Sequence, residues 1–193
     1  MKNICIVGSS CSFGDNICSS LQDSYSVHKT TSKELNVTSP TDIEKYFTKF
    51  DQIHGLVYCP AIKNKADALA DPSILHQLLS VNLFGAISCM QNSIHKMKNG
   101  KMVIIGSADG TFGNYKNTMY SVSKAALHQY TKCLATQFRE TGNEIICLVL
   151  GTIKNDDEKN AIADFIKGFM DNKIRNLNGQ LIRMDGGHHT FPL

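Results

Sequence analysis

Short apolar runs alternate along the chain with longer segments whose apolar positions recur at helical spacing. The runs typical of buried strands are residues 3–7, 25–30, 55–59, 101–106, 144–149 and 180–184. The segments typical of helices are residues 15–21, 41–50, 66–97 (broken or restarted at Pro72), 118–140 and 157–172. Such alternation predicts βαβ units with right-handed crossovers. We therefore expect an α/β fold, a doubly wound parallel sheet covered by helices on both faces.

The chain between the second and third expected strands sets the number of strands. Between Thr30 and Asn36 there is too little chain for a parallel crossover, which needs about a dozen residues. The pattern therefore predicts six parallel strands in the order 2-1-3-4-5-6, with residues 32–39 as an edge loop. No repeat or linker interrupts the pattern, so residues 1–193 are expected to form a single domain.

Charge and composition exclude several kinds of partner. The formal net charge is only +3, and no basic stripe with interleaved aromatic residues is present, so we expect no nucleic acid partner. No apolar run approaches the length of about 18 residues that a spanning helix needs, so we expect no membrane partner. The cysteines are odd in number, unpaired in spacing and mostly in apolar runs, which indicates small buried hydrophobic residues and a reduced, cytoplasmic location: Cys5, Cys11, Cys18, Cys59, Cys89, Cys133 and Cys147.

The one histidine pair does not predict a metal site. His188 and His189 are adjacent, so their side chains point apart on most backbones, and no carboxylate or cysteine pair accompanies them. We expect a surface tail there, and no metal.

A glycine-rich turn follows the first strand and precedes a helix. It reads Gly8-Ser9-Ser10-Cys11-Ser12-Phe13-Gly14. Backbone N–H groups and a helix N-terminus at such a turn suit a pyrophosphate, and small residues let the backbone approach it. A plain strand-to-helix turn has a similar composition, but the place of this turn at the head of a βαβ chain favours a dinucleotide.

A second motif, Tyr120-Ser121-Val122-Ser123-Lys124, lies on an expected helix. Residues four apart share a helix face, so Tyr120 and Lys124 stand together. A nearby ammonium should lower the tyrosine pKa from about 10 toward neutral pH, which would make Tyr120 a proton donor and acceptor beside a hydride transfer. Ser107 ends a buried strand, where parallel sheets bind ligands, and its hydroxyl could hold the substrate oxygen. Taken alone, the pair is more often a partly exposed helix pair, Ser107 a turn serine and Asn82 a helix asparagine with a solvated or capped side chain.

Together these residues resemble the short-chain dehydrogenase/reductase family, along nearly the whole chain. Gly8, Ser12 and Gly14 match the glycine motif of that family, and Ser107, Tyr120 and Lys124 match its catalytic triplet. Further matches are Asn36-Val37, Val81-Asn82, Leu150-Gly151-Thr152-Ile153 and the closing segment, residues 178–187. The resemblance implies a Rossmann-like fold and an oxidoreductase that uses a nicotinamide cofactor.

The resemblance also implies roles for particular residues. Tyr120 would be the general acid/base, Lys124 would lower its pKa and bind the nicotinamide ribose, and Ser107 would orient the substrate oxygen. Asn82 would hold a water that links Lys124 to solvent. The expected cofactor contacts are Gly8, Ser10, Ser12, Phe13, Gly14, Thr31, Ser32, Asn36, Val37, Cys59, Pro60, Ala61, Tyr120, Lys124, Gly151 and Ile153. A homodimer or homotetramer packed through the helices of Asn82 and Tyr120 is also implied.

The sequence departs from the family pattern on the cofactor side. Ser12 replaces a glycine, Asn36 an aspartate and Leu150 a proline, and Tyr58-Cys59-Pro60-Ala61 replaces Asn-Asn-Ala-Gly. Two functions stay open. One is reduction of a small-molecule or carrier-bound carbonyl, or oxidation of the corresponding alcohol, and the intact catalytic set favours it. The other is a nucleotide-binding sensor or scaffold, which the altered cofactor positions favour.

Two further expectations concern cofactor choice and the lid. After the second expected strand the chain has hydroxyls and lysines but no carboxylate until Glu34, which favours NADP, with NAD as the alternative. Only residues 152–156 remain where the family folds a helical lid over the site. We therefore expect no helix there, an open site with Ser107 and Tyr120 visible from solvent, and a substrate or partner that covers the site itself.

Overall fold

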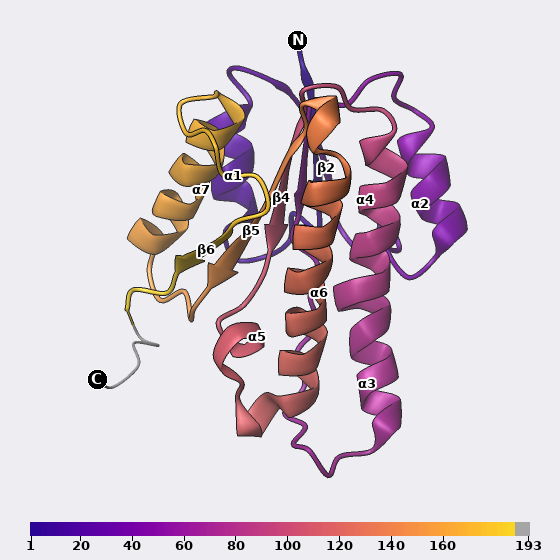
Figure 1. The fold of residues 1–193 in the computed structure, drawn as a ribbon, viewed down its shortest axis with the longest axis vertical. Coiled ribbons are helices and arrows are strands. Elements are labelled where there is room, and N and C mark those ends of the chain that lie inside the picture. The colour runs from indigo at the N-terminus through magenta and orange to yellow at the C-terminus, as the bar shows by residue number, and fades with distance from the viewer. Residues whose placement is uncertain (188–193) are drawn as a thin grey trace.

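Within residues 1–187, which the computed structural model describes, six parallel strands form one sheet in the order β2-β1-β3-β4-β5-β6 (Figure 1). This order and the parallel direction confirm the prediction from the sequence. The pair His188-His189 lies outside the described residues. The strands are β1 (Asn3–Val7), β2 (Ser26–Thr30), β3 (Gly55–Tyr58), β4 (Lys101–Ile105), β5 (Glu144–Leu150) and β6 (Leu181–Met184).

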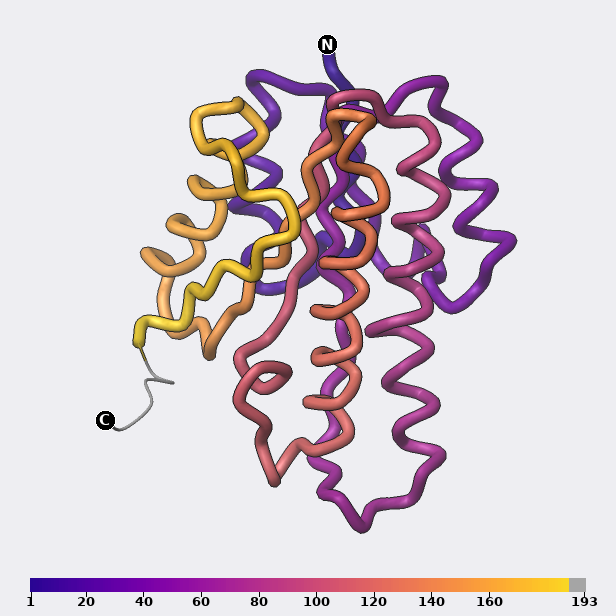
Figure 2. Tube along the Cα trace, viewed as in Figure 1, coloured from indigo at the N-terminus to yellow at the C-terminus, as the bar shows by residue number. Residues whose placement is uncertain are grey.

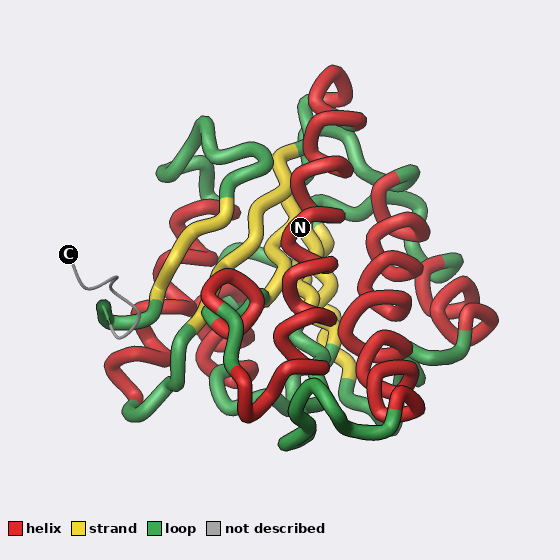
Figure 3. The backbone as a smooth tube through the Cα atoms, turned by 60° about the horizontal axis from the view of Figure 1, so that its bottom comes forward, coloured by secondary structure: helices red, strands yellow, loops and turns green. Residues whose placement is uncertain are grey.

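Helices cover both faces of this sheet (Figure 3). One face carries α1 (Gly14–Leu21) and α7 (Asp156–Met170), and the other carries α2 (Pro40–Phe47), α4 (Ala86–Ile94) and α6 (Thr118–Gln137). Successive strand residues point to opposite faces, so Cys5 and Val7 join the core beneath α2, α4 and α6, while Ile4 and Ile6 join the core beneath α1 and α7. This explains why the β1 run is continuously apolar.

Side-chain caps fix where three helices begin. Ser39 accepts a hydrogen bond from the Asp42 N–H at the start of α2, and Asn155 accepts one from the Glu158 N–H at the start of α7. Asp71 caps α3 (Pro72–Leu79) in the same way, so the predicted new start at Pro72 is confirmed.

The predicted long helix between residues 66 and 97 differs from expectation in its middle and at its ends. It starts at Pro72, changes to a π-helical segment, η1 (Ser80–Gly85), and then continues as α4 to Ile94. A π-helical turn adds a residue to the helix and often occurs at functional sites. Here the extra residue lies in the segment that contains Asn82.

The same stretch, Pro72–Ile94, is long and apolar enough by length and composition to cross a membrane, with a mean hydropathy of 1.4. The sequence expectation overlooked this because isolated uncharged polar residues interrupt the run without lowering its mean much. One side of the stretch packs against α2 and α6 and contributes Ala86, Cys89 and Met90 to the core. Core helices of globular proteins meet the same criterion, so this observation is weak evidence for a membrane.

Two loops have the form that chain length predicted. Residues 31–39 contain no helix and follow the edge strand β2, and residues 152–155 form no helix before α7 begins at Asp156. Two short helices were not expected: α5 (Asp109–Phe112) and the 3-10 turn η2 (Tyr115–Asn117). Figure 2 traces α5 against the first turns of α6, at the same end of the molecule as the start of α3.

Candidate active site

A cavity of 780 Å³ lies at the carboxyl ends of the strands, where parallel α/β sheets bind their ligands. Its size falls in the range of small-molecule and cofactor sites. Of the residues that the sequence predicted for the site, Ser12, Gly14 and Asn82 do not line it. The predicted residues that do are Gly8, Ser10, Phe13, Thr31, Ser32, Asn36, Val37, Cys59, Pro60, Ala61, Ser107, Tyr120, Lys124, Gly151 and Ile153.

The glycine turn is shaped by two close approaches of the backbone. Gly8 has a φ of +75°, and a Cβ there would lie 2.6 Å from Cγ of Pro60. A Cβ on Gly14 would overlap the carbonyl oxygen of Ser9. Neither position can hold a side chain without a shift of the backbone. Ser12 has neither constraint, because it is exposed and its φ is not positive, so a serine fits where the family pattern has a glycine.

Ser107 and Tyr120 meet at one end of the cavity. Ser107 follows β4, its N–H donates to Nε2 of His128 at 3.3 Å, and its side chain lies beside the Tyr120 hydroxyl. Tyr120 is only 8% exposed. Burial raises the pKa of its phenol, the charge of Asp109 raises it further, and the neighbouring Ser107 side chain opposes both. The expected lowering of this pKa is therefore wrong for this structure.

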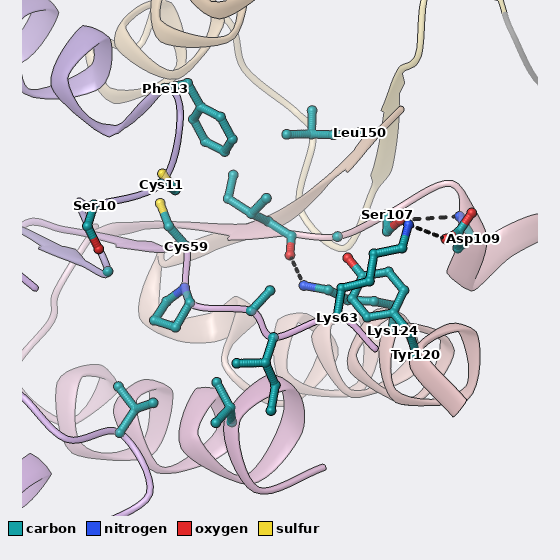
Figure 4. A pocket seen from close by; sticks show the side chains of 18 of the residues that line it. Ser10, Cys11, Phe13, Cys59, Lys63, Ser107, Asp109, Tyr120, Lys124 and Leu150 are labelled. Atoms are coloured by element: carbon teal, nitrogen blue, oxygen red, sulfur yellow. Dashed lines mark hydrogen bonds and ion pairs between the residues drawn. The ribbon is translucent and has the colours of Figure 1, made fainter. Parts of the chain in front are cut away.

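Lys124 does not lower that pKa because it lies deep beneath the site. It is 1% exposed, and its ammonium donates to the carbonyl oxygen of Ile105 at 2.8 Å (Figure 4). Its Nζ lies 5.9 Å from the centre of the Tyr120 ring. Burial lowers the pKa of Lys124 to about 8, against the opposing effects of Cys147 and Cys59. Lys124 therefore loses its proton at a lower pH than an ordinary lysine.

Asn82 lies beside the cavity and joins two segments that line it. Its Oδ1 accepts from the N–H of Ile62 at 2.8 Å, and its Nδ2 donates to the Ile62 carbonyl and to Oγ of Ser123, each at 3.0 Å. These bonds use both amide protons and one acceptor position of a fully buried side chain. In this structure Asn82 therefore fixes the loop after β3 to α6.

Three residues that the sequence expectation missed cover Tyr120. The Lys63 ammonium lies 2.9 Å from Oδ2 of Asp109 and 4.9 Å from the centre of the Tyr120 ring (Figure 4). Asn114 donates to Oδ1 of Asp109 at 3.1 Å. The expectation that Tyr120 is visible from solvent is thus wrong, although Ser107 is half-buried and accessible.

The other end of the cavity is built from loop residues. The Glu34 carboxylate accepts from the N–H of Thr31 at 2.8 Å and from its hydroxyl at 3.0 Å, which lowers the pKa of Glu34. Asn36 accepts from the N–H and the hydroxyl of Thr38. The Glu34 carboxylate is thus hydrogen bonded to Thr31, one of the hydroxyl residues after β2 that could meet the 2′-phosphate of NADP.

Comparison with known proteins places these features in a family. Residues 3–164 match the sequence model of the short chain dehydrogenases. The chain is 32% identical over 120 residues to a vibriobactin-specific 2,3-dihydro-2,3-dihydroxybenzoate dehydrogenase of Vibrio cholerae, covering 58% of this chain and 46% of the relative. It is 29% identical over 166 residues to a 3-oxoacyl-(acyl-carrier-protein) reductase of Aquifex aeolicus, covering 80% of this chain and 65% of the relative. The chain thus spans about half to two thirds of the length of these relatives.

Solved structures show the same fold. A short-chain dehydrogenase/reductase of Brucella melitensis superposes with a TM-score of 0.86 at 17% identity, covering 98% of this chain and 97% of that chain. The protein BdcA, solved in complex with NADPH, superposes with a TM-score of 0.86 at 19% identity, covering 98% of each chain. The match to the family model extends over most of the chain and includes Ser107, Tyr120 and Lys124. This chain therefore belongs to the short-chain dehydrogenase/reductase family.

Proposed function

We propose that this chain is an NADP-dependent oxidoreductase that reduces the carbonyl group of a carrier-borne or otherwise bulky substrate, or oxidises the corresponding alcohol. The observation that carries this proposal is the meeting of two hydroxyl groups, on Ser107 and Tyr120, at one end of a cavity that reaches the glycine turn. A dinucleotide cofactor would occupy the whole length of that cavity. The carbonyl group of the substrate would bind at the end where the Ser107 and Tyr120 hydroxyls lie.

The cavity fits a dinucleotide cofactor. The turn at Gly8 is free of side chains where a pyrophosphate must approach the backbone, and Thr31 and Ser32 line the end that would receive the adenosine ribose. When bound, the cofactor supplies the hydride. We infer NADP rather than NAD from the hydroxyls after β2, and the NADPH-bound relative in fold supports this choice.

The chain's own residues would manage one proton. The raised pKa of Tyr120 keeps its phenol protonated at neutral pH, so Tyr120 can donate a proton to the oxygen of a carbonyl. Ser107 can hold that oxygen by a hydrogen bond. Lys124, buried beneath both, would bind the nicotinamide ribose and exchange a proton with its surroundings at a pKa of about 8.

The surface around the cavity supports a substrate that brings its own cover. Residues 152–155 form no lid, and the cover over Tyr120 consists of the polar side chains of Lys63, Asp109 and Asn114. A small free substrate would find little enclosing apolar surface and bind weakly. The Aquifex aeolicus relative is named for an acyl-carrier-protein substrate, which supports a carrier-borne carbonyl.

We also propose a homodimer or homotetramer in the cytoplasm. The helices that contain Asn82 and Tyr120 lie side by side and expose Phe84 (56%) and Val122 (46%). Exposed apolar residues on neighbouring helices are typical of an interface between subunits.

The direct test follows NADPH and NADH absorbance with a panel of small ketones, aldehydes and 3-oxoacyl thioesters. We expect NADPH oxidation that is fastest with the thioesters. Turnover with small ketones alone would contradict the carrier-borne substrate. Tight NADPH binding with no turnover of any member would instead favour the second candidate, a nucleotide sensor, for which the altered residues around Cys59 are the supporting observation.

A further inference from the structure

Two cysteines meet at the cofactor end of the cavity. Cys11 lies in the glycine turn after β1, and Cys59 directly follows β3, the neighbouring strand. The Cys59 N–H donates to the carbonyl oxygen of Val7 at 3.0 Å, and Gly8 packs directly on Pro60. The sheet therefore holds the turn against the segment that carries Cys59.

The two thiols face each other. Figure 4 shows the sulfur atoms of Cys11 and Cys59 side by side. Both residues line the cavity, but Cys59 is 5% exposed whereas Cys11 is partly open to solvent. A small reagent in the cavity therefore reaches Cys11 first.

The surroundings give the two thiols different chemistry. The adjacent Cys59 thiol lowers the pKa of Cys11, and the backbone N–H groups of Phe13, Cys11 and Gly14 lower it further, against the opposing effect of burial. The Cys11 thiol beside it and burial both raise the pKa of Cys59. Because the thiolate is the nucleophile, Cys11 is the residue that attacks an oxidant. Cys59 is the residue that then attacks the oxidised Cys11.

We propose that Cys11 and Cys59 form a reversible disulfide when the chain meets a hydroperoxide, and that this disulfide controls access of the cofactor to the cavity. The Cys11 sulfur attacks the peroxide oxygen, which breaks the O–O bond and gives a sulfenic acid and water. The Cys59 sulfur then displaces that hydroxyl group as a second water and closes the S–S bond. Two thiols are oxidised, one hydrogen peroxide is reduced, and two water molecules leave.

The effect on the cofactor rests on the proposed function. An S–S bond of about 2 Å is shorter than any contact between two thiols, so we expect its closure to draw the turn toward Cys59. That movement shifts the backbone N–H groups around Ser10 from the position in which they meet a pyrophosphate. By linkage, a bound cofactor must in turn oppose formation of the disulfide.

Peptide mapping tests the disulfide without any need for turnover. The reduced chain is treated with hydrogen peroxide and mapped by mass spectrometry under non-reducing conditions. We expect a link between residues 3–29 and the peptide that contains Cys59, lost in Cys11→Ser and in Cys59→Ser. Cys18→Ser and Cys133→Ser are the matched controls, since Cys18 lies in the same peptide as Cys11 and Cys133 is exposed on α6; both should keep the link. A link that survives Cys11→Ser, or no link at all, would overturn the proposal.

NADPH fluorescence tests the consequence. We expect the dissociation constant of NADPH to rise about tenfold or more on oxidation, to recover with dithiothreitol, and to be insensitive to peroxide in Cys11→Ser. Saturating NADPH should slow formation of the link. A disulfide that leaves the NADPH dissociation constant unchanged would overturn the control of cofactor access. A chain that forms the link but binds NADPH in neither state would support the thiol chemistry and contradict the proposed function.

Discussion

The two ends of the cavity are built on different principles. At the proton-transfer end, Ser107, Tyr120 and Lys124 stand at the end of a buried strand and on a long helix, and each matches the family pattern. At the cofactor end, the residues lie in loops, and Ser12, Asn36 and the residues after β3 depart from that pattern. The first end is nearly closed to solvent, whereas the second is partly open.

The difference teaches where substitutions are tolerated. Lys124 and Asn82 are buried and hydrogen bonded, so a change at either leaves a carbonyl or an amide without its partner. At the open end, Ser12 replaces a glycine at an exposed position with an ordinary φ, and the change meets no neighbour. We therefore expect substitutions at the proton-transfer end to have large effects, and those at the cofactor end to have small ones that change selectivity.

The largest effect is expected for Lys124→Met. We expect turnover to fall by about 10³-fold or more, because the substitution removes the buried ammonium group that would take part in the proton transfer. The folded-state pKa of about 8 lies below the ordinary value of 10.5, so the unfolded chain holds more protons between these pH values. Burial of the charge therefore destabilises the wild type at pH 7, and this loss is relieved as the pH rises to 10.5.

Chemical unfolding across that pH range tests the sign of this effect on the free energy of unfolding. At pH 7, Lys124→Met should be more stable than the wild type by about 2 kcal/mol, after the lost hydrogen bond to Ile105 is subtracted. The advantage should disappear near pH 10.5. Lys132→Met, on the same helix and well exposed, is the control and should show no such trend. The stability of Lys124→Met is compared with that of the wild type at each pH. A difference that favours the variant less at pH 7 than at pH 10.5 would contradict the account.

Ser107→Ala compares the two ends directly with Ser32→Ala. Ser107 lies beside the Tyr120 hydroxyl, where the substrate oxygen would bind, so removal of its hydroxyl should lower kcat by about 10²-fold. Ser32 lines the cofactor end, so its removal should raise KM for NADPH a few-fold and leave kcat unchanged. Steady-state kinetics measures both. Equal losses of kcat in the two variants would break the distinction between the ends.

Asn82→Ala should act through stability. The substitution leaves the backbone of Ile62 without its partners, which should lower the free energy of unfolding by about 1–3 kcal/mol. Asn92→Ala is the matched control, because Asn92 lies on the same long helical stretch and makes a single bond to the Ser88 carbonyl. Urea titration of both variants is the measurement. Similar losses in the two would remove the special role of Asn82.

The smallest effect is expected for Glu34→Gln at the cofactor end. Removing this exposed carboxylate takes a negative charge away from the Thr31 hydroxyl, so NADPH should bind a few-fold more tightly while NADH changes little. Glu44→Gln, on α2, is a control for net charge. Dissociation constants of both cofactors give the answer. Weaker NADH binding in Glu34→Gln would instead make Glu34 a ligand of the ribose hydroxyls and favour NAD.

The sequence predicted the sheet well because its strands are local apolar runs. Six strands and their order follow from the apolar pattern and from the short chain between Thr30 and Asn36. Most of the predicted site residues line one cavity because parallel strands end at one edge of the sheet. The direction of the Tyr120 pKa was wrong because helical spacing shows that Lys124 is near, but not that burial dominates both groups.

Contacts between distant loops could not be predicted from the sequence. Lys63 and Asp109 are 46 residues apart, and neither has a pattern that announces the ion pair over Tyr120. The meeting of Cys11 and Cys59 likewise depends on β1 and β3 being neighbours and on the fold of the turn between them. The apolar pattern fixes which strands are neighbours, but the paths of the connecting loops depend on packing.

The kinetics of Tyr120→Phe test the central claim most directly. With the best 3-oxoacyl thioester of the panel, we expect kcat for NADPH oxidation to fall by at least about 10³-fold while the NADPH dissociation constant changes less than about threefold. Tyr115→Phe, at a residue 77% exposed, should match the wild type in both. A Tyr120→Phe variant that oxidises NADPH at the wild-type rate would show that Tyr120 is not the proton donor.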